Sequence, residues 1–188
     1  MSIELTILMK NVKMFKEDYI LEVKMDKNNI DFHVPRWEEL PNIDLYMDQV
    51  VSFIEESLTI LFPSKDDKED KFITKTMINN YVKQGILNAP INKKYNRTHL
   101  ARLIVICMLK QVYSINDINA LITLALETSG IEISYNKFCM LVENCVDSTF
   151  KKKEFIYEDK MTEERYLLKY VVQSFANKLY VQKTFLNK

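Results

Sequence analysis

The scarcity of glycine constrains the fold of this chain more than any other feature. Only two of the 188 residues are glycine, Gly85 and Gly130, and four are proline. The tight hairpins of an all-β protein depend on glycine in turns with positive φ, and so little glycine favours helices. The length suits one domain, or one small domain with an appendage. The sequence therefore predicts a mainly α fold with little sheet.

The same scarcity excludes several classes of function. The two glycines lie too far apart for a dinucleotide-binding fingerprint, a P-loop or a nucleophile elbow. His33 and His99 cannot form an HExxH pair, and the three cysteines lack the CxxC spacing of common zinc sites. No carboxylate stands with His, Cys or Gly in a recognisable catalytic pattern. We expect no enzymatic activity, no metal and no cofactor.

The cysteines and the hydropathy pattern indicate where the chain resides. Cys107, Cys139 and Cys145 are unevenly spaced, and the first two have apolar neighbours, which is typical of buried thiols in a reducing compartment. The N-terminus lacks a basic segment followed by an apolar one, and the longest apolar run, 103–109, is far shorter than the roughly 18 residues of a membrane span. These features predict a cytoplasmic protein that does not associate with membranes.

The zero net charge hides a strongly uneven distribution. The stretch 71–116 contains no Asp or Glu, although at the overall frequency a window of that length would hold about six. Because eight of the 26 basic residues and none of the 26 acidic residues lie there, the rest of the chain carries 18 basic and 26 acidic residues. A basic strip in an otherwise acidic protein suits contact with a phosphate backbone. An ordinary solvated face is the alternative.

The first part of the chain divides into four segments. No secondary structure is assigned to residues 1–32. The segment 33–40, bounded by prolines, is expected to be an extended strap pinned to the core by Trp37. Apolar residues at helical spacing predict a helix over 44–61, and the polar stretch 63–70 predicts a solvated loop.

Cap residues locate the next elements. Thr74 can cap a short helix that ends where Gly85 supplies a left-handed residue. At 100° per residue, Ile78 and Val82 point one way, and the opposite face carries amides, hydroxyls and a lysine but no acid. Tyr81 is expected to pack in the core. Residues 87–94 predict a short hairpin or wing. Asn96 can then cap a buried central helix. Ser114 can cap the next helix, which is expected to end before Gly130.

The C-terminal region, 129–188, is expected to be helical. Ser134 is predicted to cap one helix and Thr162 a longer one. The last helix must bury its apolar stripe against the domain or against a second copy of the chain. That stripe consists of Leu167, Tyr170, Val171, Ser174, Phe175, Lys178 and Leu179.

This order of elements over residues 33–128 resembles the MerR-type winged helix-turn-helix. The residues that carry the resemblance are INNYVKQGI (78–86), KYN (94–96) and SINDI (114–118). Asn79 stands where MerR-type helices usually carry Arg, and Asn80 stands where they carry a first Tyr. The resemblance implies a mainly α fold with a small β wing, extended at the C-terminus by the helices of 129–188.

A closer resemblance is to a bacterial family of unknown function, DUF 1836. Three blocks agree in order and spacing, namely RWEELPNIDLYMDQVV, TKTMINNYVKQGIL and KKYNRTHLARLIVICMLKQVYSINDI. This resemblance covers about residues 33–128. It implies a MerR-like fold and transcriptional regulation, with no chemistry attached.

The residue types of the outer face suit DNA. Asn can pair with the adenine edge in the major groove, so Asn79 and Asn80 are expected to read bases with help from Thr76 and Lys83. Tyr95 is expected either to pack the wing or to bond a phosphate. In the alternative reading, the two asparagines only terminate local structure. The remaining residues, expected to contact the DNA backbone, are Lys75, Lys93, Lys94 and Arg97.

The sequence thus predicts a regulator that binds double-stranded DNA through the helix near 75–84 and the wing near 87–95. A homodimer formed through the C-terminal helices is expected, because winged-helix proteins gain affinity from two half-sites. The alternative is a protein-interaction module that uses the same basic face. Whether the region after Gly130 binds a small effector is left open.

Overall fold

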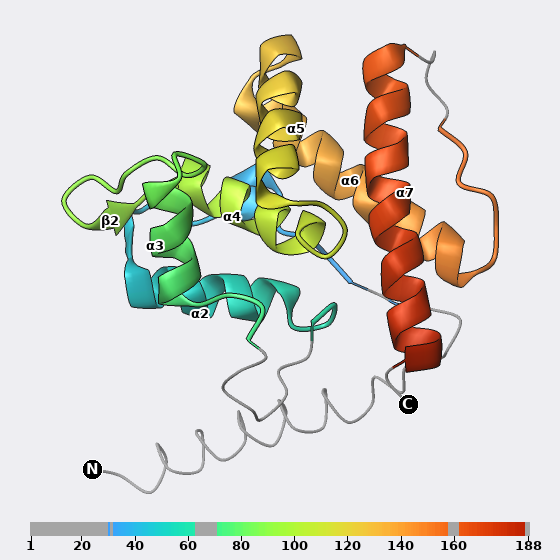
Figure 1. The fold of residues 1–188 in the computed structure, drawn as a ribbon, viewed down its shortest axis with the longest axis horizontal. Coiled ribbons are helices and arrows are strands. Elements are labelled where there is room, and N and C mark those ends of the chain that lie inside the picture. The colour runs from blue at the N-terminus through green and yellow to red at the C-terminus, as the bar shows by residue number, and fades with distance from the viewer. Residues whose placement is uncertain (1–29, 31, 63–70, 158–161, 187–188) are drawn as a thin grey trace, which may run out of the picture.

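The computed structural model describes residues 30, 32–62, 71–157 and 162–186 (Figure 1). The expectations for most of 1–32 and for the loop 63–70 therefore fall outside the described residues. The described part is mainly helical, with one small sheet, as predicted. The elements in chain order are η1 (Trp37–Glu39), β1 (Leu45–Tyr46), α2 (Met47–Leu58), α3 (Lys75–Lys83), β2 (Lys94–Tyr95), α4 (Arg97–Leu109), α5 (Ile115–Thr128), α6 (Ile131–Phe150), α7 (Glu163–Val181) and η3 (Gln182–Leu186).

The sheet joins the start of the domain to the wing. β1 pairs antiparallel with β2, so that Leu45 lies opposite Tyr95 and Tyr46 lies opposite Lys94. The prediction of a helix from about residue 44 is therefore wrong at its first residues. α2 begins only at Met47, where the Gln49 side chain accepts a 2.9 Å hydrogen bond from the Tyr46 N–H.

The short hairpin predicted for 87–94 is present as a tight turn, and we call this hairpin the wing. The backbones of Ile91 and Lys94 exchange hydrogen bonds of 3.1 and 2.9 Å. Asn92 and Lys93 between them have φ angles of 51° and 62°, as in a type I′ turn. The twist of this turn matches that of the strands, and pairing of β2 with β1 fixes the wing to the domain.

Most of the predicted caps are confirmed. The side chains of Thr74, Asn96, Ser114 and Thr162 each accept a backbone N–H at the start of α3, α4, α5 and α7. The prediction for Ser134 is wrong, because α6 begins at Ile131. The Ser134 hydroxyl instead donates to the carbonyls of Ala125 and Ser129, so it joins α6 to the end of α5.

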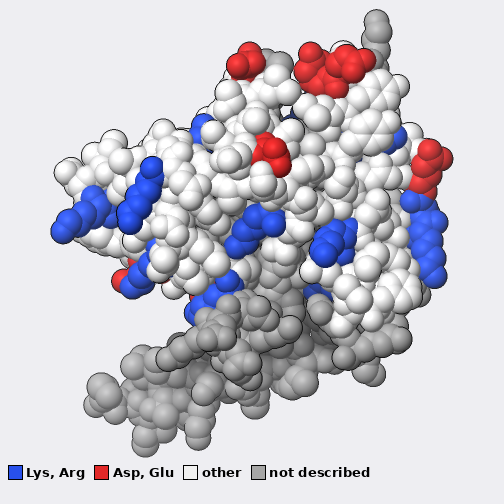
Figure 2. Space-filling model, in the orientation of Figure 1, with Lys and Arg blue, Asp and Glu red and all other residues white. Residues whose placement is uncertain are grey.

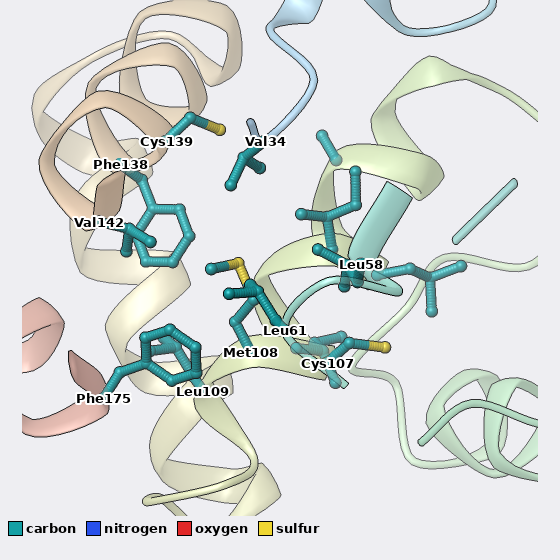
Figure 3. Close-up of a cluster of buried hydrophobic side chains, with 14 of the residues drawn as sticks. Val34, Leu58, Leu61, Cys107, Met108, Leu109, Phe138, Cys139, Val142 and Phe175 are labelled. Atoms are coloured by element: carbon teal, nitrogen blue, oxygen red, sulfur yellow. The ribbon is translucent and has the colours of Figure 1, made fainter. Parts of the chain in front are cut away.

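One hydrophobic core runs through the described chain, from Ile30 to Leu179. α4 is buried around most of its circumference, as predicted, and Figure 3 shows side chains of α2, α6 and α7 gathered around Met108 and Leu109. The three cysteines are unpaired and buried, as expected. None of the described helices is both long enough and apolar enough to span a membrane.

The strap joins this core to the C-terminal region. The Trp37 N–H donates to the Asn136 side chain at 2.7 Å, and the Tyr135 hydroxyl donates to the Pro35 carbonyl at 2.7 Å. Arg36 forms an ion pair with Glu143 of α6. The strap is not extended throughout, because the Glu39 carboxylate accepts the Arg36 N–H and closes the 3-10 turn η1. Trp37 is half-buried against the core, as expected.

α7 packs along α6 with a different stripe from the one predicted. Val171, Phe175 and Leu179 are buried as expected, but Leu167 and Tyr170 are exposed. Val172 and Ala176 are buried instead, so the contact is rotated about the helix axis. The exposed side carries Tyr166 stacked on Tyr170, with ring centroids 6.2 Å apart.

Candidate nucleic-acid interface

α3 presents one continuous polar face to solvent. Ile78 and Tyr81 are buried, and burial raises the pKa of Tyr81 to about 12, which confirms the inward position predicted for this tyrosine. In Figure 1, α3 lies on the outer side of the fold beside the wing, with its other side against the domain. The five exposed side chains fall within about half a turn of the helix and are Lys75, Thr76, Asn79, Asn80 and Lys83.

The C-terminal end of α3 is held firmly. Gly85 has a φ of 72°, in the left-handed region that favours glycine. The N–H groups of Ile86 and Leu87 both donate to the Tyr81 carbonyl, at 3.0 and 3.1 Å. Both side chains are then buried. The polar face of α3 is therefore carried on a helix whose two ends are fixed, by Thr74 and by this turn.

The wing places its basic residues in different environments. Lys93 is exposed in the turn, and the Lys94 ammonium lies 5.1 Å from the centre of the Tyr46 ring. Tyr95 is only 2% exposed and packs edge-on against His99 at 5.3 Å. Of the two roles expected for Tyr95, its position supports wing packing, because the buried side chain offers almost no surface to a phosphate.

Tyr46 and Trp37 also belong to this face, which the sequence did not predict. Tyr46 supports Lys94, and the Arg97 guanidinium lies 5.6 Å from the centre of the Trp37 ring. Arg97 is half-buried, and its Nε has no acceptor among the described residues. The sequence signal for these contacts was weak because each joins segments about 50 or more residues apart.

The described residues hold no cluster of three or more His, Cys, Asp and Glu side chains placed to bind a metal ion. The model of a domain of unknown function, DUF1836, matches residues 35–138. This chain belongs to the DUF1836 family. The matched region begins in the strap, includes α3, the wing, α4 and α5, and ends inside α6, which confirms the family resemblance found in the sequence. Neither a curated protein nor a solved structure matches the chain.

The acid-free stretch of this DUF1836 protein does not form a single basic surface. Arg102 donates to the Ile86 carbonyl, and Lys110 donates to the Phe72 carbonyl in a site where burial lowers its pKa. Lys71 pairs with Glu55 at 3.1 Å, and Lys75 pairs with Asp48 of α2. The eight cations of the basic strip therefore do not lie together on one exposed face.

The cations that remain gather around α3 and the wing. Lys83 and Lys93 are exposed, and neither forms an ion pair with a carboxylate of the described residues. Figure 2 shows Lys and Arg side chains over the wing and α3 and also across the rest of this face, with groups of Asp and Glu side chains at the far ends of α5 and α7 and a few elsewhere. Lys83 and Lys93 therefore leave a net positive charge on the face around α3, even though Lys75 is paired with Asp48.

One feature of this DUF1836 protein departs from the usual helix-turn-helix. The two helices of that motif are commonly joined by a turn of 3–4 residues. Here residues 59–74 separate α2 from α3. The two helices nevertheless pack together, and both pack on the same core through Ile54 and Ile78.

His99 of α4 packs against Tyr95 of the wing and is buried. Its Nδ1 lies 3.1 Å from the Asn96 backbone N and 2.6 Å from the Asn96 Oδ1, so the N-cap residue of α4 holds the ring in place. Burial lowers the pKa of His99, whereas backbone groups of Asn88 and Ala89 and the charge of Asp44 raise it less, and Arg102 lowers it further. Below about pH 6.5 the unfolded chain therefore binds a proton at His99 more readily than the folded chain does, so acid lowers the stability of the fold.

We expect the free energy of unfolding to fall between pH 7.5 and pH 5.5, and the loss to be smaller in His99→Gln, which keeps an acceptor for Asn96. Urea titration at the two pH values measures both. The control is His33→Gln, because His33 is exposed and its removal must leave the loss in place. Equal losses in wild type and His99→Gln would show that His99 is not the group responsible.

Proposed function

We propose that this DUF1836 protein is a transcriptional regulator that binds double-stranded DNA with a MerR-like winged helix-turn-helix. The observation that carries the proposal is the exposed face of α3, where two adjacent amides, a hydroxyl and lysines stand beside a basic wing turn. Amides at this position suit base edges, and the surrounding cations suit phosphates. In this proposal the protein acts in the cytoplasm and has no catalytic role.

The arrangement of the elements supports this docking mode. A recognition helix must project from the domain far enough to enter the major groove, which is about 12 Å wide. α3 lies at the outer side of the fold, and the β1–β2 pairing keeps the wing beside it (Figure 1). With α3 in the major groove, the wing would lie along the adjacent backbone.

Each residue of the face then has a distinct task. Asn79 and Asn80 read bases, and Thr76 and Lys83 contact bases or the nearest phosphates. Lys93 at the wing turn contacts the backbone. Lys75 must exchange its partner Asp48 for a phosphate. Lys94 and Arg97, held over Tyr46 and Trp37, complete the backbone contacts.

We further propose that the regulator acts as a homodimer through the exposed side of α7. Tyr166, Leu167 and Tyr170 expose apolar surface there, and neither α6 nor the core covers it. Pairing of two copies would present two α3 helices to two half-sites, which raises affinity by effective concentration.

The double variant Lys83→Gln/Lys93→Gln tests the electrostatic part of the proposal. Loss of two phosphate contacts should weaken binding to every DNA sequence and lower the salt slope of log K by about two. Fluorescence anisotropy with random and selected duplexes at several salt concentrations measures both. The control Lys152→Gln/Lys153→Gln removes the same charge from exposed positions after α6 and should leave the slope unchanged. Equal slopes in both variants would place the DNA elsewhere.

A protein-interaction module on the same face is the second candidate function. Ile43, Tyr46 and Ile91 are more than half exposed near the wing, and exposed apolar side chains beside cations suit a protein partner with acidic rim residues. A partner recruited to this face through those apolar side chains would bind in the presence of excess DNA.

A further inference from the structure

A cavity of about 160 Å³ lies between α4, α5, α6 and α7. Its walls are mainly apolar and include Val105 of α4, Leu121 of α5, Phe138 of α6 and Val171 of α7. Leu124 and Ile133, which also line it, are 41% and 65% exposed, so the cavity reaches the surface near the junction of α5 and α6. An apolar cavity with a few convergent polar groups is the usual form of a small-molecule site.

Arg102 is the polar group that stands out in this lining. Its Nη1 donates to the Ile86 carbonyl at 3.0 Å, and its Nε is buried with no acceptor. No carboxylate of the described residues forms an ion pair with it. A guanidinium has five N–H donors, and a half-buried one without an anion is costly. Arg102, a residue of the cavity lining, therefore has one buried N–H donor, at Nε, without a partner.

We propose that this cavity binds a small apolar monocarboxylate, with the carboxylate on the Arg102 guanidinium and the hydrocarbon part among the apolar side chains. The planar fork of arginine suits the two oxygens of a carboxylate. A cavity of about 150 Å³ with a similar lining holds benzene. The expected ligands are therefore of the size of benzoate or hexanoate.

The other charged groups of the lining are consistent with an anion. Lys137, Arg165 and Glu164 also line the cavity, so cations outnumber the acid. The Lys137 ammonium lies 5.9 Å from the centre of the Tyr157 ring. Glu164 is exposed in the first turn of α7, where its hydrogen bond with Thr162 lowers its pKa. It stays ionised near neutral pH and disfavours a second acidic group on the ligand.

The position of Arg102 connects the cavity with α3. Ile86, whose carbonyl Arg102 holds, directly follows Gly85 at the exit of α3. A carboxylate that binds and reorients the guanidinium would compete with its hydrogen bond to the Ile86 carbonyl. The backbone at the end of α3 would then lose this contact. The ligand should thus change DNA affinity, a consequence that rests on the proposed function, whereas the binding itself does not.

Isothermal titration of the full chain without DNA tests the binding. Benzoate and hexanoate should bind one to one and raise the melting temperature, and benzyl alcohol and hexanol should bind at least tenfold more weakly. Equal binding of acids and alcohols would overturn the role of Arg102. Absence of binding by both acids at millimolar concentration would overturn the site.

Three variants locate the site. Arg102→Met should remove the preference for the acids and leave the weak binding of the alcohols. Because that variant also loses the bond to Ile86, Val105→Phe provides an independent test, since it fills the cavity without changing the guanidinium and should abolish binding of both classes. Lys178→Met, on an exposed position outside the lining, should bind as wild type. Wild-type binding by folded Val105→Phe would place the ligand elsewhere.

Discussion

Replacing Phe175 by alanine is expected to lower the free energy of unfolding by about 3–5 kcal/mol. Phe175 is 1% exposed and comes from α7, yet its ring lies 6.3 Å from that of Phe62, just beyond α2. It thus joins the C-terminal region to the core of the domain, beside Leu109 (Figure 3). Removal of the ring would leave a cavity where these parts meet.

Chemical denaturation monitored by circular dichroism measures the effect, with Met140→Ala as the control. Met140 is 47% exposed on α6, outside both the cavity lining and the proposed dimer surface, so its loss should change the free energy by no more than about 0.5 kcal/mol. A single transition is expected for wild type, because the core is continuous. Two separate transitions, or a loss below about 1 kcal/mol for Phe175→Ala, would contradict the packing of α7 on the domain.

The double variant Asn79→Ala/Asn80→Ala is expected to lose binding to its specific site by about 2 kcal/mol or more, a factor of about 30, while its affinity for random DNA changes little. Each bidentate contact between a side chain and a base contributes about 1–3 kcal/mol of discrimination. Alanine is a better helix former than asparagine, so α3 should remain folded in this variant. The loss would then come from the missing amides.

Anisotropy with a mapped site and with random duplex measures this difference. The matched control is Asn116→Ala/Asn144→Ala, which removes two exposed amides from α5 and α6 and should bind both DNAs as wild type does. Equal loss on the specific site and on random DNA would refute base reading by Asn79 and Asn80. It would support backbone contact alone.

Local signals in the sequence predicted much of the fold. Thr74, Asn96, Ser114 and Thr162 cap helices because a short polar side chain bonds the nearest free N–H, a contact that depends on neighbours three residues away. The polar face of α3 followed from helical periodicity in the same way. These features need no knowledge of the rest of the chain.

The errors arose where distant segments decide the structure. Tyr46 belongs to a strand only because Lys94 lies opposite it, and Ser134 lies within a helix because α6 packs against the end of α5. Tyr170 is exposed because α6 covers a neighbouring stripe of α7. Arg102 and Lys110 were counted in the basic strip, although their place on the buried α4 and just after it was a signal that they do not belong to an exposed basic surface.

The measurement that tests the central claim most directly is the capture of sheared genomic DNA by the purified protein at two salt concentrations, followed by sequencing of the retained fragments. The proposed function predicts enrichment of one or a few sites that persists at the higher salt, since specific contacts remain when phosphate contacts weaken. It also predicts that Asn79→Ala/Asn80→Ala loses this enrichment. Uniform retention that disappears at the higher salt would contradict a sequence-specific regulator and favour a protein partner for this face.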